Sequence, residues 1–563
     1  SYESPHPPRV LKTLPVIRHL GAYAGPDHGR FLFDALVTEP DLELTYLPAW
    51  RTLVENHALA GAMSAISSLN GVPGIAHQSL LRATLKGSWR FDGYVISDCD
   101  TFPSLLENWD WAGTKAQAAA SALKAGNDIN CGPGFASLLN ATRRGYTSRK
   151  DLEVAARRAL TMRMRVGELQ PPQTDPWRVH AKPLSEVGGA AHVKMVERIV
   201  SGGTVLLHHK EGTLPIGPSS SSSSLAATSS STAIPSSASA YRIALIGPAA
   251  DNPSIQAHTY HGTPSKWLTI RQALLDELPS TLPKATLDYA MGAEIDSYNT
   301  SGFQHALRIA SSSDVIIYCG GLHAAMEEED TDRMRSLGLP GVQLPLLRQL
   351  RSVANERNVP LIAILVSGGP LAVPTLTPPS YNAPDALLWL SYFGMSARPL
   401  AKILLGTEYP SGRLPFSVPH NESLLPPITD YSMTSFPGRT YRYLDDSAAP
   451  PLYPFGHGLS LTKWKYTSQL LPSKSELTIA ELEKAANEPC TSTAAIAFTT
   501  TISLAAISGG ANGPANATTS VLLFGALEES SGPKSPFPRK ALLAFTKPTL
   551  SVGGKAEKVE LRV

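Results

Sequence analysis

The sequence predicts an α/β protein of several domains, and three stretches with different patterns support that prediction. Residues 1–170 alternate short apolar runs with helical patterns, and residues 241–435 repeat the alternation with longer apolar runs. After Phe436 the pattern changes to Thr-, Val- and Leu-rich strands between Gly and Pro turns. Strand–helix alternation with short loops is typical of a parallel sheet, and a succession of short alternating strands is typical of a β-sandwich.

The first stretch predicts about four strand–helix units. VIRHLGAY, AGAMSAI, DGYVISD and AGNDINCG have the pattern of strands, and residues 78–87 and 115–124 have the pattern of helices between them. Polar side chains fall at the carboxyl ends of these strands, at His19, Asp98 and Asp128. In a (β/α) barrel that end carries the catalytic residues. We therefore expect 1–170 to form a parallel sheet with its polar residues on the catalytic face that a (β/α) barrel would have.

The second and third stretches predict two further domains. YRIALIGP, SDVIIYCGG, PLIAILVSGG and DALLWLSYF are continuous apolar strands, which indicates a doubly wound or sandwich-like α/β domain over 171–435. A Pro-rich connector (QPPQTDPW), a helix and the strand TVLLHH come before it, and a Ser-rich insertion spans 218–240. FTTTISLAA, TTSVLLFGAL and KVELRV then indicate a β-sandwich over 436–563.

Composition narrows the classes of function. The chain has 563 residues, of which 42% are hydrophobic and 17% charged, which is typical of a folded protein of two to four domains. Lys and Arg number 49 against 47 Asp and Glu, so no basic surplus is available for nucleic acid or an anionic membrane. The longest apolar stretch, at 360–373, is too short to span a bilayer and contains Gly and Pro. We expect neither a nucleic-acid nor a membrane partner.

Two groups of carboxylates are the candidates for chemistry. Asp98 ends an apolar strand, where it is either an aimed nucleophile or an ordinary helix N-cap. Glu327, Glu328 and Glu329 begin an acidic run in the loop after SDVIIYCGG, which is either a solvated loop or part of a site. If that loop reaches over the cleft of another domain, two carboxylates could face one substrate, one ionised and one protonated.

Other types of site are absent from the sequence. GPAADNP and CGGLHAA lack the spacing of phosphate loops, and no HEXXH, paired CxxC, EF-hand or GxSxG motif occurs. His208 and His209 lie in an edge-like strand, where a structural or exposed role is favoured over metal ligation. We therefore expect neither a metal nor another cofactor.

The cysteines and sequons favour a secreted protein. Cys99 and Cys131 follow acidic strand ends and either form a bridge or stay as two buried thiols. Sequons occur in contexts that resemble loops, and together they favour the secretory pathway; their asparagines are Asn140, Asn299, Asn421 and Asn516.

Nine motifs occur in an order that resembles glycoside hydrolase family 3, most of all its fungal β-xylosidase branch. They are LNGVPG, RFDGYVISDCD, AGNDINCG, GTLPI, RIALIGPAADN, EEEDTDR, GRLPFSVP, PGRTYRY and PLYPFGHGLS. The resemblance covers nearly the whole chain. It implies a (β/α)8-type barrel, an α/β sandwich domain and a fibronectin type III-like domain. It also implies a retaining hydrolase that releases xylose from xylo-oligosaccharides.

The same resemblance implies a role for individual residues. Asp98 matches the family nucleophile, and Glu329 matches the acid/base, with Glu327 as second choice. Arg18 and His19 align with a Lys-His pair that holds sugar hydroxyls. Met63 falls at a cleft-lining methionine, and Cys99 and Cys131 match cysteines that bridge in the family.

The chain departs from the family pattern at several positions. Lys of the Lys-His pair is Arg18, Tyr-Asn of one strand is Ile66-Ser67, Gly after the acid/base is Asp330, and GQSGG is GMSAR. By the same resemblance, we expect 1–170 to begin at the fifth barrel strand and to form the C-terminal half of the barrel, and we expect the signal peptide to lie outside this sequence. These departures favour, as an alternative, a non-catalytic relative that binds glycans. Within the enzymes, β-glucosidase and α-L-arabinofuranosidase are the alternatives to β-xylosidase.

Overall fold

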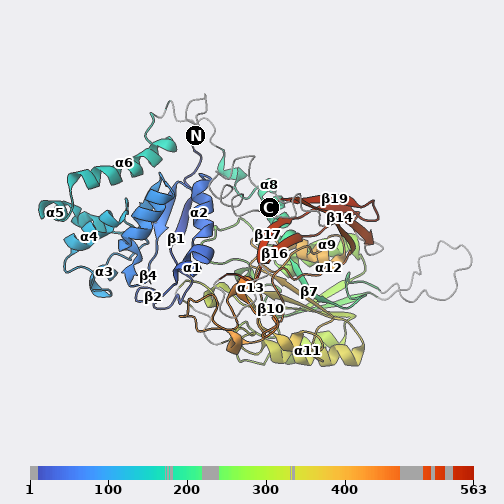
Figure 1. Ribbon diagram of the computed structural model, residues 1–563. Helices are drawn as coiled ribbons and strands as arrows, with labels where there is room; N and C mark the ends of the chain where they lie inside the picture. Colours follow the sequence, from blue (N-terminus) through green and yellow to red (C-terminus); the bar gives the residue numbers. More distant parts are fainter. Residues whose placement is uncertain are drawn as a thin grey trace, which may run out of the picture.

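The computed structural model shows three regions, which follow one another along the chain (Figure 1). The N-terminal region lies at the left, a large α/β sheet lies at the lower right, and C-terminal strands cover the upper right. The structure describes residues 11–171, 173, 177, 182–218, 240–329, 331, 336–469, 499–508, 514–526 and 537–562. The expected Ser-rich insertion lies almost wholly outside these residues, as does Asp330.

The N-terminal region is built on a parallel sheet of order β1-β3-β6. A second small sheet and a series of helices surround it. The strands are β1 (Val16–Leu20), β2 (Asp34–Ala35), β3 (Gly61–Ser64), β4 (Ser68–Leu69), β5 (Val72–Pro73) and β6 (Tyr94–Ile96). The helices are α1 (Glu39–Asp41), η1 (Leu42–Tyr46), α2 (Pro48–Glu55), η2 (Gly74–Ala76), η3 (Ser79–Ser88), α3 (Ser104–Glu107), α4 (Lys115–Ala125), η4 (Gly134–Ser137), α5 (Leu138–Arg143) and α6 (Arg149–Arg165).

Two predicted elements of this region differ from the structure. The expected fourth strand, AGNDINCG, is reduced to one parallel bridge between Ile96 and Ile129, because the chain turns away at Gly132 directly after it. The expected helix at 78–87 is a π-helix, η3. In contrast, α4 begins where predicted, capped by Thr114, and buries an alanine-rich face.

The central region is a six-stranded sheet of order β7-β12-β11-β10-β8-β9, in which only β7 is antiparallel. Its strands are β7 (Val205–His209), β8 (Arg242–Ile246), β9 (Thr286–Ala290), β10 (Val315–Gly321), β11 (Leu361–Val366) and β12 (Ala386–Leu390). Its helices are η5 (Leu184–Glu186), α8 (Ala190–Gly203), η7 (Pro253–Ile255), α9 (Ile270–Thr281), α10 (Phe303–Ser311), η8 (Ala324–Met326), α11 (Gln343–Arg357), η9 (Pro374–Leu376), α12 (Arg398–Leu405), η10 (Glu422–Leu424) and α13 (Thr440–Tyr443).

Helices cover both faces of this sheet, as its continuous apolar strands predict. One core cluster packs the sheet against α8, α9 and α12, and another packs it against α10 and α11. Along β10, Ile317 and Cys319 face the first cluster, and Ile316 and Tyr318 face the second. Figure 1 shows α11 beneath the sheet and α9 and α12 above it.

The strand order places a topological switch point between β8 and β10, where ligands commonly bind at the carboxyl edge of such sheets. Two glycines shape that edge. Gly247, with φ +119°, follows β8, and a Cβ there would lie 2.1 Å from the carbonyl oxygen of Cys319. Gly321, with φ +130°, ends β10, and a Cβ there would lie 2.0 Å from the carbonyl oxygen of Val366. Only glycine fits these turns, because any Cβ would collide with the backbone of the neighbouring strand.

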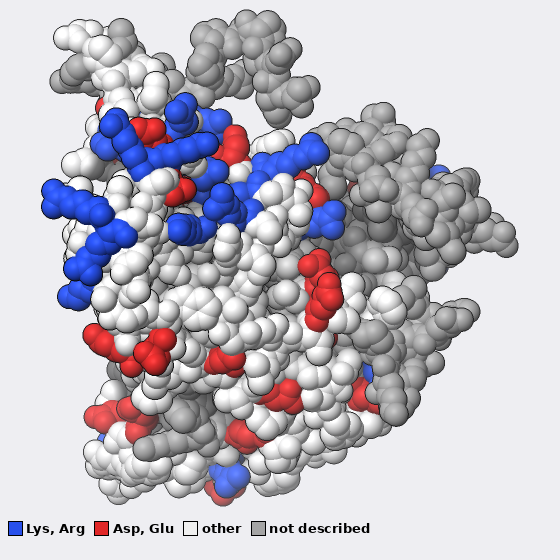
Figure 2. Space-filling view, turned by 60° about the vertical axis from the view of Figure 1, so that its left-hand side comes forward, with Lys and Arg blue, Asp and Glu red and all other residues white. Residues whose placement is uncertain are grey.

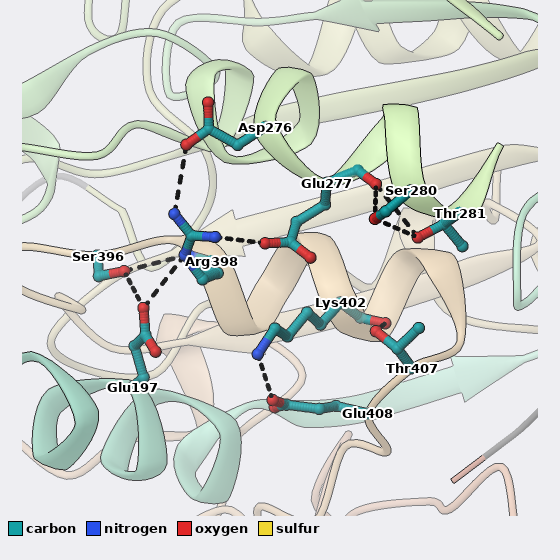
Figure 3. Close-up of polar contacts among 10 residues, drawn as sticks. All are labelled: Glu197, Asp276, Glu277, Ser280, Thr281, Ser396, Arg398, Lys402, Thr407 and Glu408. Carbon is teal, nitrogen blue, oxygen red and sulfur yellow. Dashed lines mark hydrogen bonds and ion pairs between the residues drawn. The ribbon is translucent and has the colours of Figure 1, made fainter. Parts of the chain in front are cut away.

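One arginine joins three helices on the first face of the sheet (Figure 3). Arg398 begins α12 and pairs with Glu197 of α8 and with Asp276 and Glu277 of α9. A cation at a helix N-terminus is unfavourable by itself, and the three carboxylates offset this. Arg398 takes the place of the last glycine of the family motif GQSGG. Its side chain contacts carboxylates of α8 and α9, and none of the predicted catalytic carboxylates.

The C-terminal region is antiparallel and is formed by three small sheets, β13-β14-β19, β15-β18 and β16-β17. A small core, centred on Ala506, Leu550 and Leu561, lies between them. The strands are β13 (Lys463–Gln469), β14 (Thr499–Ser508), β15 (Asn516–Thr518), β16 (Val521–Gly525), β17 (Ala541–Thr546), β18 (Thr549–Ser551) and β19 (Glu557–Arg562). The predicted strands near 498–506, 518–527 and 558–563 correspond to β14, β16 and β19.

Charge is unevenly spread over the surface of the N-terminal region. Figure 2 shows Lys and Arg gathered on the upper part of one face and Asp and Glu below them. Helix α6 carries six of the basic residues, and four of these pair with carboxylates: Arg149, Arg158, Arg163 and Arg165. Its cations are therefore largely neutralised locally. Among the described residues, no helix is both long and apolar enough to cross a membrane.

Candidate active site

Asp98 lies at the carboxyl end of β6, at the rim of the N-terminal sheet. Its side chain is only 8% exposed. Its Oδ1 accepts a hydrogen bond from the Cys99 backbone N–H at 2.8 Å, and its Oδ2 lies 2.8 Å from His19 Nε2. The backbone hydrogen bond orients this buried carboxylate and leaves Oδ2 facing the imidazole, and an oriented carboxylate is what an aimed nucleophile requires.

Two neighbouring strands bring the other predicted sugar-site residues to the same rim. Arg18 and His19 lie on β1, and His19 also contacts Tyr23 in an edge-to-face arrangement, with ring centroids 5.0 Å apart. Met63 lies on β3, half-buried and paired in register with Ile96 of β6. Because β1, β3 and β6 run parallel, their carboxyl ends meet there, as the sequence pattern predicts.

Asp128, predicted at this rim as well, has a structural role instead. Its buried carboxylate contacts Lys86 Nζ at 2.6 Å and Arg158 Nη1 at 3.2 Å, and accepts a hydrogen bond from the Val95 backbone N–H. Burial lowers the pKa of Lys86 to about 8, although the charge of Asp128 opposes the shift. This ion pair fastens η3 and α6 to the end of the small sheet.

Glu329 reaches this rim from the central region, in the loop that follows β10 and η8. Its Oε1 lies 3.5 Å from Arg18 Nη2, and its Oε2 accepts a hydrogen bond from the Tyr260 hydroxyl at 2.6 Å. Two neighbouring residues of β1 therefore contact one carboxylate each: His19 contacts Asp98 of the first region, and Arg18 contacts Glu329 of the second.

Glu327 occupies a different environment from Glu329, two residues away. It is half-buried, and its carboxylate accepts hydrogen bonds from the backbone N–H groups of Gly368 and Gly369, at 2.7 and 3.1 Å. The Tyr392 hydroxyl donates a further bond at 2.7 Å. With its oxygens engaged in this way, Glu327 anchors the loop to the ends of β11 and β12.

Arg18 connects the two regions electrostatically. Its guanidinium lies over the Tyr260 ring, 4.9 Å from the centroid. A side-chain hydrogen bond with Tyr260 raises the pKa of Arg18 above its ordinary value, and the charges of Glu329 and Asp98 add to this effect. Arginine's planar group can stack on an aromatic ring and pair with a carboxylate together, which a lysine ammonium does less well.

Two further groups of predicted residues are the cysteines near Asp98 and the asparagines of the sequons. Cys99 and Cys131 form a disulfide, so the residue after Asp98 is tied to the loop that follows Ile129. The sequon asparagines Asn140, Asn299, Asn421 and Asn516 are all exposed. Two of them do not lie in loops as expected. Asn140 belongs to α5, because the segment Leu138–Arg143 continues the preceding 3-10 turn as a helix, and Asn516 begins β15, where it pairs with Ser551 of β18.

Several residues of the site were not anticipated from the sequence. Tyr260, His258 and Thr259 follow η7, and Tyr392 follows β12. One signal in the sequence was the glycine pair Gly368-Gly369, just after the apolar strand β11. Backbone N–H groups at such a strand end can bind a carboxylate, and here they bind Glu327. Among the described residues, no group of three or more His, Cys, Asp or Glu side chains is arranged to hold a metal ion.

The fold and the site define a class of protein: a multidomain α/β protein with carboxylates at the carboxyl ends of parallel strands in two regions, Asp98 of the first beside His19 and Glu329 of the second beside Arg18. The glycosyl hydrolase family 3 N-terminal domain model matches residues 12–162, and the family 3 C-terminal domain model matches residues 204–461. The chain belongs to glycoside hydrolase family 3.

Relatives with similar sequences carry xylosidase names. The chain is 30% identical to a probable β-D-xylosidase 6 of Arabidopsis thaliana over 485 residues, which are 83% of this chain and 55% of the relative. It is 29% identical to a probable exo-1,4-β-xylosidase bxlB of Aspergillus fumigatus over 99% of this chain and 67% of the relative. The chain therefore spans between about half and two thirds of the length of these relatives.

Solved structures support the multidomain α/β fold. A family 3 exo-β-xylosidase in complex with a xylobiose aziridine probe superposes with a TM-score of 0.82 at 24% identity, over 98% of this chain and 68% of that one. A β-glucosidase from Erythrobacter marinus superposes with a TM-score of 0.75 at 23% identity, over 97% and 68%.

Proposed function

We propose that this chain belongs to a retaining, exo-acting β-xylosidase, which releases xylose from the non-reducing end of xylo-oligosaccharides. The observation that supports the proposal best is a pair of contacts made by neighbouring residues of β1: His19 contacts Asp98, and Arg18 contacts Glu329. It unites two carboxylates from different regions at one rim. Paired carboxylates that flank a glycosidic bond are the usual machinery of glycoside hydrolysis.

In the proposed reaction, Asp98 is the nucleophile and Glu329 the acid/base. Asp98 attacks the anomeric carbon while Glu329 gives its proton to the leaving oxygen, which forms a xylosyl ester on Asp98. Glu329 then takes a proton from water, which attacks the same carbon and frees both xylose and Asp98. In retaining enzymes the two carboxyl groups stand about 5–5.5 Å apart during catalysis. Arg18, His19 and Met63 would contact the sugar.

The remaining parts of the proposal concern architecture and compartment. We assign 1–170 to the second half of a (β/α)8-type barrel, 171–435 to an α/β sandwich domain, and 436–563 to a fibronectin type III-like domain. The parallel order β1-β3-β6 and the antiparallel C-terminal sheets support the first and last assignments. Secretion and glycosylation are supported by the disulfide and the four exposed sequon asparagines.

A panel of 4-nitrophenyl glycosides tests the proposal. We expect faster release of nitrophenol from the β-D-xyloside than from the α-L-arabinofuranoside or the β-D-glucoside, and loss of that activity in Asp98→Asn. Faster turnover of the arabinofuranoside or the glucoside would show that this glycoside, and not the β-xyloside, is the preferred substrate. Binding of xylobiose without any turnover would instead select the non-catalytic alternative.

A further inference from the structure

Three consecutive residues after η7 contact three consecutive residues of the acidic loop in register. His258 Nε2 lies 3.1 Å from the Glu327 carbonyl oxygen, and the Thr259 hydroxyl donates to Glu328 at 3.4 Å. The Tyr260 hydroxyl donates to Glu329 at 2.6 Å. The two segments are 69 residues apart in the sequence, so the fold alone creates this matching. We call residues 258–260 the strap.

Further contacts with the central region fix the positions of both the strap and the acidic loop. Glu327 is fixed to the backbone of Gly368 and Gly369, and the His258 ring packs on Tyr392, with centroids 5.1 Å apart. Both the strap and the loop leave the sheet near the switch point between β8 and β10. Beyond Glu327 the loop is held by side chains: Thr259 contacts Glu328, and Tyr260 and Arg18 contact Glu329.

Tyr260 is the unusual member of the strap. Its backbone has φ +64°, the left-handed region that non-glycine residues seldom adopt, and it is 73% exposed. Backbone strain of this kind is kept where the surrounding structure imposes it, and it commonly marks functional sites. The side chain uses this conformation to reach Glu329 with its hydroxyl while its ring supports Arg18.

We propose that Tyr260 is a positioning residue for the acid/base, and that it acts by orienting the Glu329 carboxylate. The proposal rests on the proposed function, since it takes Glu329 as the proton donor. The hydroxyl holds one carboxylate oxygen and Arg18 the other. Glu329 can then turn only within narrow limits between the leaving oxygen and the attacking water.

Two aryl xylosides separate positioning from a general effect on structure. A 2,4-dinitrophenyl group leaves without protonation, whereas a 4-methoxyphenyl group needs the acid. For Tyr260→Phe we expect kcat/KM, which reports the steps up to the xylosyl ester, to fall about tenfold for the methoxyphenyl xyloside. It should change less than about twofold for the dinitrophenyl xyloside. Tyr381→Phe, an exposed tyrosine beside the residues that precede β11 and β12, is the matched control.

Hydrogen exchange provides a measurement that needs no turnover. Tyr260→Phe should speed exchange in peptides that cover residues 323–331, because it removes the hydrogen bond to Glu329. Tyr381→Phe should leave these peptides unchanged.

The outcomes distinguish this proposal from the proposed function. An equal fall in kcat/KM for both xylosides, or unchanged exchange in Tyr260→Phe, would overturn the role of Tyr260. If the unsubstituted chain hydrolyses neither xyloside, the proposed function fails for this chain. Exchange then decides the proposal alone: faster exchange supports positioning by Tyr260, and unchanged exchange rejects it.

Discussion

Glu327 and Glu329 are two residues apart, yet their surroundings assign them different tasks. Glu327 accepts two backbone N–H bonds and a tyrosine hydroxyl, whereas Glu329 is exposed and faces Arg18 and Tyr260. A carboxylate that is saturated by fixed donors suits anchoring, and one held by two side chains at a rim is able to exchange a proton. The geometry therefore favours Glu329 as the acid/base.

Substitution of each glutamate tests this assignment. We expect Glu329→Gln to lower kcat/KM for xylobiose at least about 100-fold while the thermal midpoint stays within about 1 °C. Azide should restore turnover of an activated aryl xyloside by the Glu329→Ala variant. Glu327→Gln should lower the thermal midpoint, because an amide NH₂ would face the backbone N–H groups of the glycines. Azide rescue of Glu327→Ala in place of Glu329→Ala would reverse the assignment.

Lys86 predicts a pH dependence of stability. Burial lowers the pKa of Lys86 to about 8, below its value of about 10.4 in an unfolded chain. Between those values the unfolded state binds more protons, so this residue makes the free energy of unfolding rise with pH from about 8 to about 10.4. The thermal midpoint of Lys86→Met should fall relative to the unsubstituted chain across that window. Parallel midpoints for the two proteins from pH 8 to 10 would contradict the prediction.

At the scale of elements, Arg398 joins α8, α9 and α12 through three carboxylates. The arginine is about one third exposed, so solvent screens these pairs and the network is worth about 1 kcal/mol rather than the sum of three buried bonds. We expect Arg398→Ala to lower the free energy of unfolding by about that amount, and the difference to shrink in 1 M salt.

Lys402 provides the matched control for this network. It lies on the same helix and pairs with a single carboxylate, that of Glu408 (Figure 3). Lys402→Ala should cost less than Arg398→Ala. If the two substitutions lowered the free energy of unfolding equally, the contacts of Arg398 with three helices would contribute no more than a single ion pair on α12.

Strands that are buried on both faces were predicted correctly from the sequence, whereas an exposed edge strand was missed. β8, β10, β11 and β12 are continuous apolar runs because helices cover both of their faces, so their pattern is unambiguous. β9 was missed because TLDYA is an edge strand, exposed along much of its length. The strand expected at AGNDINCG is reduced to one bridge, between Ile96 and Ile129, because the chain turns away at Gly132.

At the scale of the whole molecule, the site exists because two regions meet. Asp98 and His19 could be placed on neighbouring strand ends from the alternation of strands and helices, whereas Met63 was named only through the family resemblance. The contact between Arg18 and Glu329 spans 311 residues, and the one between Tyr260 and Glu329 spans 69. No local pattern encodes such pairings, and for this reason Glu329 could be selected from the sequence only by resemblance, and Tyr260 not at all.

The central claim is that Asp98 forms a covalent bond to the sugar, with Glu329 as its partner. The most direct measurement is the intact mass of the chain after incubation with a 2-deoxy-2-fluoro-β-xyloside that carries a good leaving group, followed by peptide mapping. We predict the mass of one fluoro-xylosyl group, located on Asp98 and absent from Asp98→Asn. An adduct on another carboxylate, or hydrolysis of xylosides without any adduct, would contradict the account.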